Sequence, residues 1–181
     1  MKIKTKKIYG ERIYLRQLTE ADASSNYSSW LNDHEVNKYL ATRKITINEL
    51  RKYIKEKNAS GSCLLLGIFC KEEHIGNIKL EAIDHKKGTA EMGILIGNKN
   101  YWGKGIGKEA TKLVLDYAFG ELNLNEICLG VVSGNKAAIK LYEDVGFETR
   151  KINKKARNHD GVVFDEIIMT IRNDKYKTTG A

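Results

Sequence analysis

The chain has 181 residues, of which 41% are hydrophobic and 30% are charged, a balance that excludes wholesale disorder and suffices for one folded domain. No apolar run approaches the roughly 20 residues that cross a bilayer, and the basic start lacks the apolar stretch of a signal peptide. We therefore expect a single domain over residues 1–181, located in the cytoplasm and without membrane association.

The net charge of +8 admits three kinds of partner: a nucleic acid, an acidic protein or a polyanionic small ligand. Most basic residues are scattered, and we interpret the two clusters as solvated faces, so a nucleic acid is not the partner we expect. The clusters are Lys2, Lys4, Lys6 and Lys7, and then Lys151, Lys154, Lys155 and Arg157. The three cysteines, Cys63, Cys70 and Cys128, lie in apolar runs without metal-finger spacing, which predicts reduced thiols and no metal site.

The first part of the chain predicts one strand followed by two helices. Residues 12–18 alternate in the manner of a strand. Thr19 follows as an N-cap, with Asp22 three residues on and apolar residues at helical spacing after it. Thr46 begins the second helix, whose apolar face contains Leu50.

Three strands come next and predict an antiparallel meander. Residues 63–70 form a continuous apolar run, which is typical of a strand buried on both faces. Residues 76–83 and 89–97 are the second and third strands, and Gly93 predicts a bulge in the third.

The second part predicts a helix over 109–122, a strand over 126–132, a helix over 135–145 and two strands up to residue 172. The polar tail, residues 173–181, is expected to be frayed. The sum is an α/β (α+β) protein, a mixed sheet of about seven strands with about four helices covering both faces.

A glycine-rich loop, WGKGIGK at 102–108, lies between a predicted strand and a predicted helix. Glycine lets backbone N–H groups turn toward a ligand without interference from a Cβ atom. A helix start adds unpaired N–H donors and the positive end of the helix dipole. Together with the charges of Lys104 and Lys108, these features indicate a cradle for phosphate.

Two familiar phosphate-binding motifs do not fit this loop. A Walker A motif requires Ser or Thr after Gly-Lys, but Glu109 follows Gly107 and Lys108. The segment GIGKEA at 105–110 matches the dinucleotide pattern with a final alanine, but the acidic residue expected about 20 positions on should end a strand. Glu126 begins one instead, and the rest of the chain is too short for a full dinucleotide-binding sheet.

Three motifs occur in order along the chain: YWGKGIGKEA at 101–110, NKAAIKLY at 135–142 and GF at 146–147. With them, the chain resembles the GNAT superfamily of N-acetyltransferases, and in particular its RimJ/RimL-like branch. Each motif alone is weak, but the three at this spacing are specific, and the match extends from GERIYLR at 10–16 to the last strand. The resemblance implies acetyl-CoA as cosubstrate and an amine as acceptor.

The resemblance also implies a GNAT-like fold in which the two central strands splay apart into a V-shaped coenzyme cleft. The pantetheine arm would pair with the backbone of 95–97, the pyrophosphate would lie on the amides of 103–108, and Asn135 would contact the pantetheine from its helix start. Read from the residues alone, Asn135 is equally well explained as an N-cap. The coenzyme residues implied are Leu95, Ile96, Gly97, Trp102, Gly103, Lys104, Gly105, Ile106, Gly107, Lys108 and Asn135.

Attack of an amine on a thioester requires loss of a proton from the ammonium, stabilisation of the acetyl oxygen and a proton for the leaving thiolate. The resemblance places Tyr142 near the coenzyme sulfur as general acid; packing in the core is the alternative. Some relatives carry a glutamate five residues before the helix asparagine, where this chain has Gly130. We take Glu91, near the start of a strand facing the cleft, as the candidate base, with a surface carboxylate or water as alternatives.

The acceptor is less constrained by the sequence. A small amine, such as an amino sugar nucleotide or a polyamine, is the first hypothesis, and a protein N-terminal amine is the second. A non-catalytic RNA-binding module is the alternative from another class. Asp33 and His34 lie in the region that usually walls the acceptor pocket. A homodimer is left open.

Overall fold

The computed structural model describes residue 3 and residues 5–40, 44–159 and 161–179. The strands are β1 (Ile8–Tyr9), β2 (Tyr14–Gln17), β3 (Leu64–Cys70), β4 (Glu73–Asp84), β5 (Thr89–Ile96), β6 (Glu126–Val132), β7 (Glu148–His159) and β8 (Val162–Arg172). The helices are α1 (Ser25–Asn32), α2 (Ile47–Ala59), α3 (Ile106–Gly120), α4 (Lys136–Val145) and α5 (Asn173–Thr179), with 3-10 turns at Glu20–Asp22 and Lys99–Tyr101. None of the described helices is long and apolar enough to span a bilayer.

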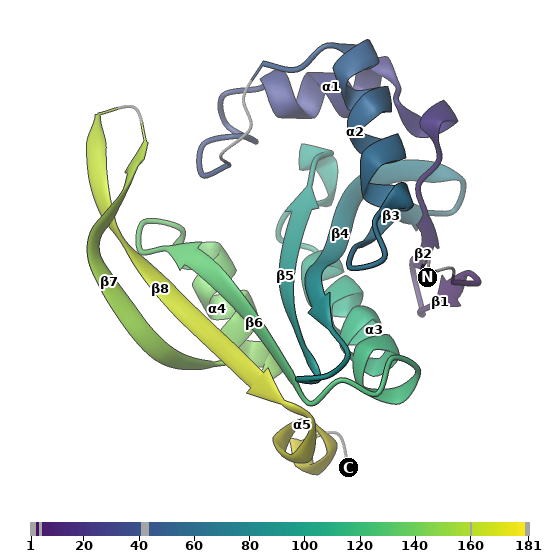
Figure 1. Ribbon diagram of the computed structural model, residues 1–181. Helices are drawn as coiled ribbons and strands as arrows, with labels where there is room; N and C mark the ends of the chain where they lie inside the picture. The colour runs from purple at the N-terminus through teal and green to yellow at the C-terminus, as the bar shows by residue number, and fades with distance from the viewer. Residues whose placement is uncertain (1–2, 4, 41–43, 160, 180–181) are drawn as a thin grey trace.

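All strands belong to one mixed sheet in the order β1-β2-β3-β4-β5-β6-β8-β7, with helices packed on both faces (Figure 1). The expected mixed α/β fold is confirmed, with one strand more than predicted, the two-residue β1. Strands β3, β4 and β5 form the predicted antiparallel meander, and β5 pairs with β6 in parallel. This architecture leaves two separate apolar cores, one on each face of the sheet.

The alternation of side chains along the strands decides which residues enter which core. One core joins Leu66, Ile78 and Met92 of the sheet to Val114 of α3. The other contains Leu65 of β3 together with residues of α1 and α2, among them Tyr27, Trp30, Leu50 and Ile54. Because β3 contributes to both cores, its run of apolar residues without alternation is explained.

Strands β5 and β6 separate soon after they meet. Their parallel pairing covers only Thr89 to Glu91 of β5 and Glu126 to Cys128 of β6. Beyond these residues both strands continue, and they diverge in Figure 1, while β5 remains paired with β4 and β6 with β8. The splayed central strands that the sequence resemblance implied are therefore present.

The predicted helix starts are partly confirmed. Thr46 caps α2 by accepting from the Glu49 N–H, and the Glu49 carboxylate accepts from the Thr46 N–H at 2.8 Å. Thr19, however, closes the same kind of box with Asp22 around a short 3-10 turn, not α1. The chain bends after this turn, and Ser24 caps α1 by accepting from Tyr27 at 3.1 Å.

Two other expectations are corrected. Gly93 pairs regularly with Lys79, and its missing side chain leaves room for Lys79 Cε, which would lie 3.2 Å from a Cβ atom. The bulge lies in β4 instead, between Glu81 and Asp84, where Ala82 has a φ of 50°.

The tail from residue 173 forms α5 and is not frayed over its described length. Its Tyr176 hydroxyl donates to Asp116 Oδ1 at 2.9 Å, and its ring lies 5.5 Å from that of Phe119. These contacts bind the tail to α3, and they involve residues too far apart in sequence for a local pattern to reveal. Residues 180 and 181 of the predicted tail lie outside the described residues.

Candidate active site

The glycine-rich loop turns sharply into α3. Gly103 and Gly105 have φ angles of +69° and +76°, in the left-handed region that residues with a Cβ atom rarely adopt, and Gly105 is the N-cap of α3. The Glu109 N–H donates to Gly105 at 3.1 Å and is the first N–H that the helix satisfies. The three preceding amides, at residues 106–108, have no partner within the helix, so they form a donor cluster at its positive end.

Arg12 holds this loop in place. Its guanidinium donates to the carbonyl oxygen of Lys104 at 2.7 Å and to the Glu109 carboxylate at 2.8 Å. The Glu109 carboxylate also accepts from the Arg12 N–H at 2.9 Å, so the turn before β2 and the first turn of α3 are joined. Reading the sequence did not find this pair, because its members are 97 residues apart and neither has a local signal.

Gly107 and Gly97 allow close packing. A Cβ atom on Gly107 would lie 2.6 Å from Leu141 Cδ1, so the glycine lets α4 approach α3. A Cβ atom on Gly97 would lie 2.0 Å from the ring of Trp30 in α1. Both glycines belong to the predicted coenzyme site, but the structure gives each of them a packing role first.

The edge of β5 that faces the gap is set by the pairing of its other edge. The Gly97 N–H donates to Ile75 at 2.9 Å, and Leu95 pairs with Asn77, so the backbone of Leu95 and Gly97 is turned toward β4. The alternation therefore turns the backbone of Ile94 and Ile96 toward the gap. A ligand along this edge would therefore meet the backbone of Ile94 and Ile96, whereas the backbone of Leu95 and Gly97, which the sequence predicted as pantetheine contacts, is paired with β4.

Trp102 links the loop to this edge. Its Nε1 donates to the carbonyl oxygen of Ile96 at 2.8 Å, while the side chain is 40% exposed. The indole N–H thus binds the last carbonyl oxygen on the open edge of β5. The N–H groups of Ile94 and Ile96 on the same edge stay available to a ligand. The loop and the open edge therefore form one continuous donor surface.

Asn135 and Tyr142 lie at the start and in the body of α4. The side-chain oxygen of Asn135 accepts from the Ala138 N–H at 3.2 Å, which makes it the N-cap. Tyr142 is buried, with its ring 5.7 Å from that of Phe147, and burial raises its pKa to about 12. A phenol with this pKa is neutral at physiological pH and can donate its proton but not accept one.

Two carboxylates lie near the point where β5 and β6 separate. Glu91 pairs with Cys128 at the last rung of the parallel ladder and is exposed. By alternation its side chain is on the same face as Gly93, two residues along the strand. Glu166 of β8 fills the space beside Gly130, with Oε1 3.0 Å from the position of the absent Cβ atom. The Arg157 guanidinium bound to it lowers the pKa of Glu166.

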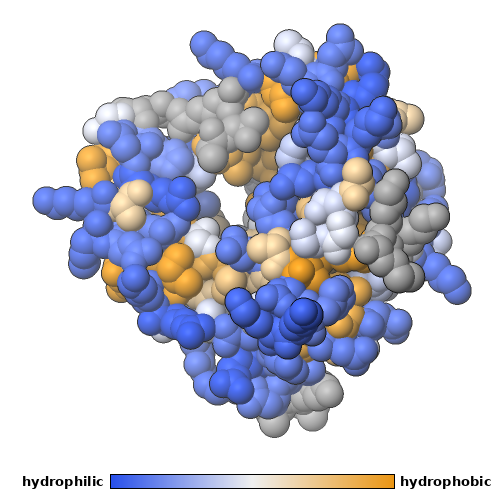
Figure 2. Space-filling model, viewed as in Figure 1, coloured by the Kyte–Doolittle hydropathy of each residue, from blue (hydrophilic) through white to orange (hydrophobic). Residues whose placement is uncertain are grey.

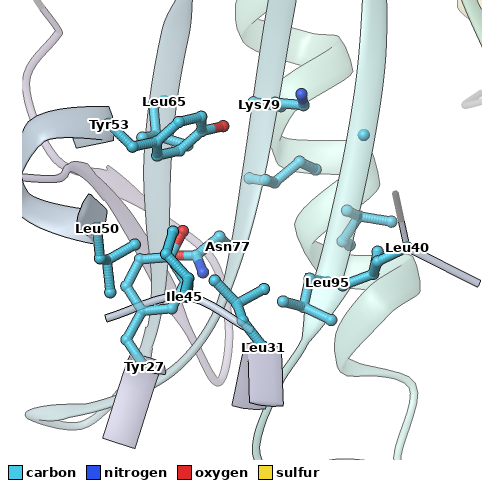
Figure 3. Close-up of a pocket in the computed structure, with 13 residues that line it drawn as sticks. Tyr27, Leu31, Leu40, Ile45, Leu50, Tyr53, Leu65, Asn77, Lys79 and Leu95 are labelled. Atoms are coloured by element: carbon cyan, nitrogen blue, oxygen red, sulfur yellow. The ribbon is translucent and has the colours of Figure 1, made fainter. Parts of the chain in front are cut away.

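A pocket of about 240 Å³ lies on the face of the sheet covered by α1 and α2, and most of its lining is apolar (Figure 3). It is lined by Tyr27, Leu31, Leu40, Ile45, Leu50, Tyr53, Leu65, Asn77, Ile78, Lys79, Gly93, Ile94 and Leu95. Gly93 to Leu95 belong to β5, so the pocket reaches the strand that also borders the gap. Figure 2 shows an opening between the β7–β8 side and the α1–α2 side of the molecule.

Asp33 and His34, expected in the acceptor wall, are not among the lining residues. Asp33 instead binds Lys99 at 2.8 Å, and this ammonium lowers the pKa of Asp33. Lys99 also binds Glu35 at 2.9 Å, so the segment after α1 is fastened to the chain that leads into the glycine loop.

The combination of a splayed sheet, a glycine turn and an apolar pocket agrees with the family comparison. A family profile described as "Acetyltransferase (GNAT) domain" matches residues 12–148. The chain belongs to the GNAT family. It is an N-acetyltransferase, and acetyl-CoA is its cosubstrate.

Individual relatives share much of the chain length. The N-acetyltransferase p20 of Bacillus licheniformis is 30% identical over 175 residues, which cover 93% of this chain and 97% of that protein. A spermidine N-acetyltransferase from Vibrio cholerae, solved with CoA and spermine, has a TM-score of 0.85 at 25% identity, covering 93% of this chain and 99% of the other. The acetyltransferase RimL, solved with coenzyme A, has a TM-score of 0.85, with the same coverage of both chains, but 16% identity, which concerns the fold alone.

Proposed function

We propose that this GNAT enzyme acetylates the primary amine of a small molecule, by direct attack of the amine on the acetyl-CoA thioester. The main support for this proposal is the position of the apolar pocket. It contacts β5 from one face of the sheet, while the glycine loop and α3 lie on the other face. An amine in the pocket and a thioester at the open edge of β5 would therefore meet across the gap.

In this proposal the pyrophosphate binds the amides of residues 103–108, with Lys104 and Lys108 adding positive charge. The pantetheine lies along the open edge formed by Ile94 and Ile96. Trp102 and Asn135 border the site and hold its backbone: Trp102 fixes the Ile96 carbonyl and Asn135 caps α4. The donor-rich loop suits the pyrophosphate and the open edge of β5 suits the pantetheine, and Trp102 joins the two.

The chemistry follows from the groups present. The amine nitrogen bonds to the thioester carbon, and the carbon–sulfur bond breaks. The N–H groups of Ile94 or Ile96 stabilise the charge that develops on the acetyl oxygen. The neutral Tyr142 phenol supplies the proton that the leaving thiolate takes, and Glu91 or a water molecule accepts the proton that the ammonium loses.

Glu91→Gln tests the assignment of the base. Because Glu91 shares a face with the pocket lining, we expect the variant to lose about 10- to 100-fold in kcat/KM near neutral pH and to recover part of it as the pH rises toward the pKa of the amine. Initial rates across a pH series measure this. Glu166→Gln is the matched control: the ion pair with Arg157 weakens Glu166 as a base, so its pH profile should keep the wild-type shape. Identical profiles for wild type and Glu91→Gln would leave water as the base.

The same observations bear on the alternatives. A pocket of about 240 Å³ is small even for a compact ligand and suits a small amine better than a long peptide. The basic cluster on β7 is partly neutralised, since Lys154 binds Asp165 and Arg157 binds Glu166. This pairing weakens the case for an RNA-binding module. The homodimer stays a prediction.

A thiol-release assay with acetyl-CoA tests the proposed function. The panel holds small amines, polyamines, amino sugar nucleotides and short peptides with a free N-terminus. We expect thiol release with small amines and a lower kcat/KM with longer peptides that share the same first residue. If peptides are uniformly better acceptors than small amines, the protein N-terminal alternative replaces the proposal.

A further inference from the structure

Asn77 lies in the wall of the pocket with half of its amide unpaired. The side chain is 6% exposed, and its Oδ1 lies 2.9 Å from His74 Nε2. The same Nε2 lies 3.0 Å from the carbonyl oxygen of Gly76. Since a carbonyl only accepts, Nε2 carries the proton, and this fixes Oδ1 as the amide atom that faces His74. Asn77 Nδ2 is left buried, with no hydrogen-bond partner in the described part of the chain.

The surroundings of His74 keep this amide in one orientation. Burial lowers the pKa of His74, so the ring stays neutral with a single N–H, and it stacks on Phe69 with 4.9 Å between ring centroids. Rotation of the Asn77 amide would place its NH2 group against that N–H, donor against donor. The unpaired NH2 group is therefore a fixed feature of the pocket wall.

A buried N–H group without a partner is unfavourable, and native proteins rarely retain one unless a ligand or water completes it. Figure 3 shows the Asn77 amide among the lining side chains, near those labelled Tyr27, Ile45 and Leu31. An NH2 group can only donate, so its missing partner is an acceptor atom, such as an oxygen.

The other polar side chains of the described lining, Tyr27, Tyr53 and Lys79, can each donate a hydrogen bond, and the two phenols can also accept one. Burial raises the pKa values of Tyr27 and Tyr53, so both phenols keep their protons at neutral pH. Lys79 is a cation, and its partner Glu81 is shared with Lys57 at 2.8 Å. No carboxylate is found among the described residues that line the pocket. The described lining therefore offers a polycation such as a polyamine no carboxylate of its own, whereas a carbonyl oxygen would find several donors.

The rest of the lining is hydrocarbon, supplied from three sides by α1, α2 and the sheet. Leu31, Leu50, Leu65 and Leu95 are among its side chains. Apolar surface buried against them stabilises a complex in proportion to its area. The pocket thus has room for one apolar group, and the Asn77 NH2 group can donate to an uncharged or anionic oxygen beside it.

We propose that the acceptor is an α-amino compound with an apolar side chain, whose carbonyl oxygen accepts a hydrogen bond from Asn77 Nδ2. This inference rests on the proposed function and narrows it. The shared chemistry is an amine one carbon away from a carbonyl group, which a free amino acid, its amide and a peptide N-terminus all possess. The oxygen binds Asn77 on β4, the side chain enters the apolar pocket, and the amine is directed toward β5 and the gap.

Two amines that differ only at the carbonyl test the proposal. L-Leucinamide and 3-methylbutylamine carry the same branched side chain, but only leucinamide has the oxygen. Because the carbonyl also lowers the pKa of the neighbouring amine, the rates are compared per unprotonated amine. On that basis we expect the wild-type kcat/KM for leucinamide to exceed that for 3-methylbutylamine by about tenfold or more, from one hydrogen bond to a buried donor. Leucine, leucylglycine and spermidine complete the panel. Leucine represents a free amino acid, leucylglycine a peptide N-terminus, and spermidine a polyamine without a carbonyl group.

Asn77→Asp is the matching variant, because it keeps the oxygen that faces His74 and replaces only the unpaired NH2 group. We expect the leucinamide preference to fall to about unity and the relative rate with spermidine to rise, since a carboxylate repels a carbonyl oxygen and attracts a cation. Thermal unfolding and acetyl-CoA affinity check that the variant is folded. Should it fail to fold, the wild-type ratio by itself decides the question.

The outcomes separate this inference from the proposed function. A wild-type ratio near unity, a preference for spermidine over leucinamide, or a ratio unchanged in Asn77→Asp would overturn the role of Asn77 while thiol release still supports an acetyltransferase of small amines. Thiol release with long peptides but with no small amine would overturn the proposed function itself.

Discussion

Gly105→Val is expected to weaken acetyl-CoA binding by at least about 100-fold while the protein still folds. Gly105 has a φ of +76°, which a β-branched residue adopts only under strain, so the variant would turn the loop and misalign the amides of residues 106–108. Its Cβ would also lie 3.4 Å from the Arg12 guanidinium that holds the loop. Calorimetric titration with acetyl-CoA measures the affinity, and thermal unfolding measures the fold.

Gly161→Val is the control for backbone strain. Gly161 has a φ of +81° in the turn between β7 and β8, and a Cβ atom added to it would have no neighbouring atom within 4 Å. Both variants should lose about 1–2 kcal/mol of folding stability, but only Gly105→Val should lose coenzyme affinity. Unchanged affinity in folded Gly105→Val would contradict the assignment of the loop as the pyrophosphate site. Gly107 is a less clean probe, because a side chain there meets Leu141 and disturbs the packing of α3 on α4.

Tyr142→Phe is expected to lower kcat by roughly 100-fold or more and to leave acetyl-CoA affinity within about twofold of wild type. Phenylalanine keeps the ring that packs against Phe147, so the variant removes the acidic proton and little else. Steady-state rates and calorimetric affinities give the two quantities. Tyr176→Phe, which removes a hydroxyl bound to Asp116 on α3, should leave kcat unchanged.

The pH dependence of turnover provides a second comparison between the wild-type enzyme and Tyr142→Phe. Burial raises the pKa of Tyr142 to about 12, so the phenol keeps its proton through pH 10, where an exposed tyrosine would already be half ionised. The ratio of wild-type to variant turnover should therefore stay constant up to about pH 10 and narrow above it. Equal turnover of wild type and Tyr142→Phe at every pH would remove the acid role.

In the proposed mechanism, each face of the sheet binds one of the two substrates. Residues of α3 and α4, with the glycine loop, lie on the coenzyme side, and those of α1 and α2 lie on the acceptor side. The three-rung ladder between β5 and β6 and the apolar core beneath α3 join the two halves of the sheet. Lys99 joins the two sides by binding Asp33 and Glu35 close to the loop.

The order of elements and the glycine loop could be predicted because their causes are local. Thr46 and Glu49 close a capping box within one turn, the alternation of β2 follows from its own residues, and Gly103 and Gly105 have the left-handed φ angles that their residue type favours. The three ordered motifs were sufficient to predict the family, and with it acetyl-CoA and the splayed sheet. Each of these features depends on residues a few positions apart.

The tertiary structure decided what depends on contacts between distant residues. The pairing of β5 with β4 turns the backbone of Ile94 and Ile96, and not that of Leu95 and Gly97, toward the gap. A one-residue change in register would have reversed this, and register is fixed by packing on both faces of the sheet.

Burial and hydrogen bonding across the fold decided the rest of the site. Trp30 requires Gly97 to have no side chain, and Glu166 occupies the space beside Gly130. His74 fixes the amide of Asn77, so that its NH2 group in the pocket has no partner among the described residues. The sequence alone determined which family and which coenzyme, because short motifs carry that information. Which atoms line the pocket was decided only by the folded chain, because burial and pairing are properties of residues brought together from different elements.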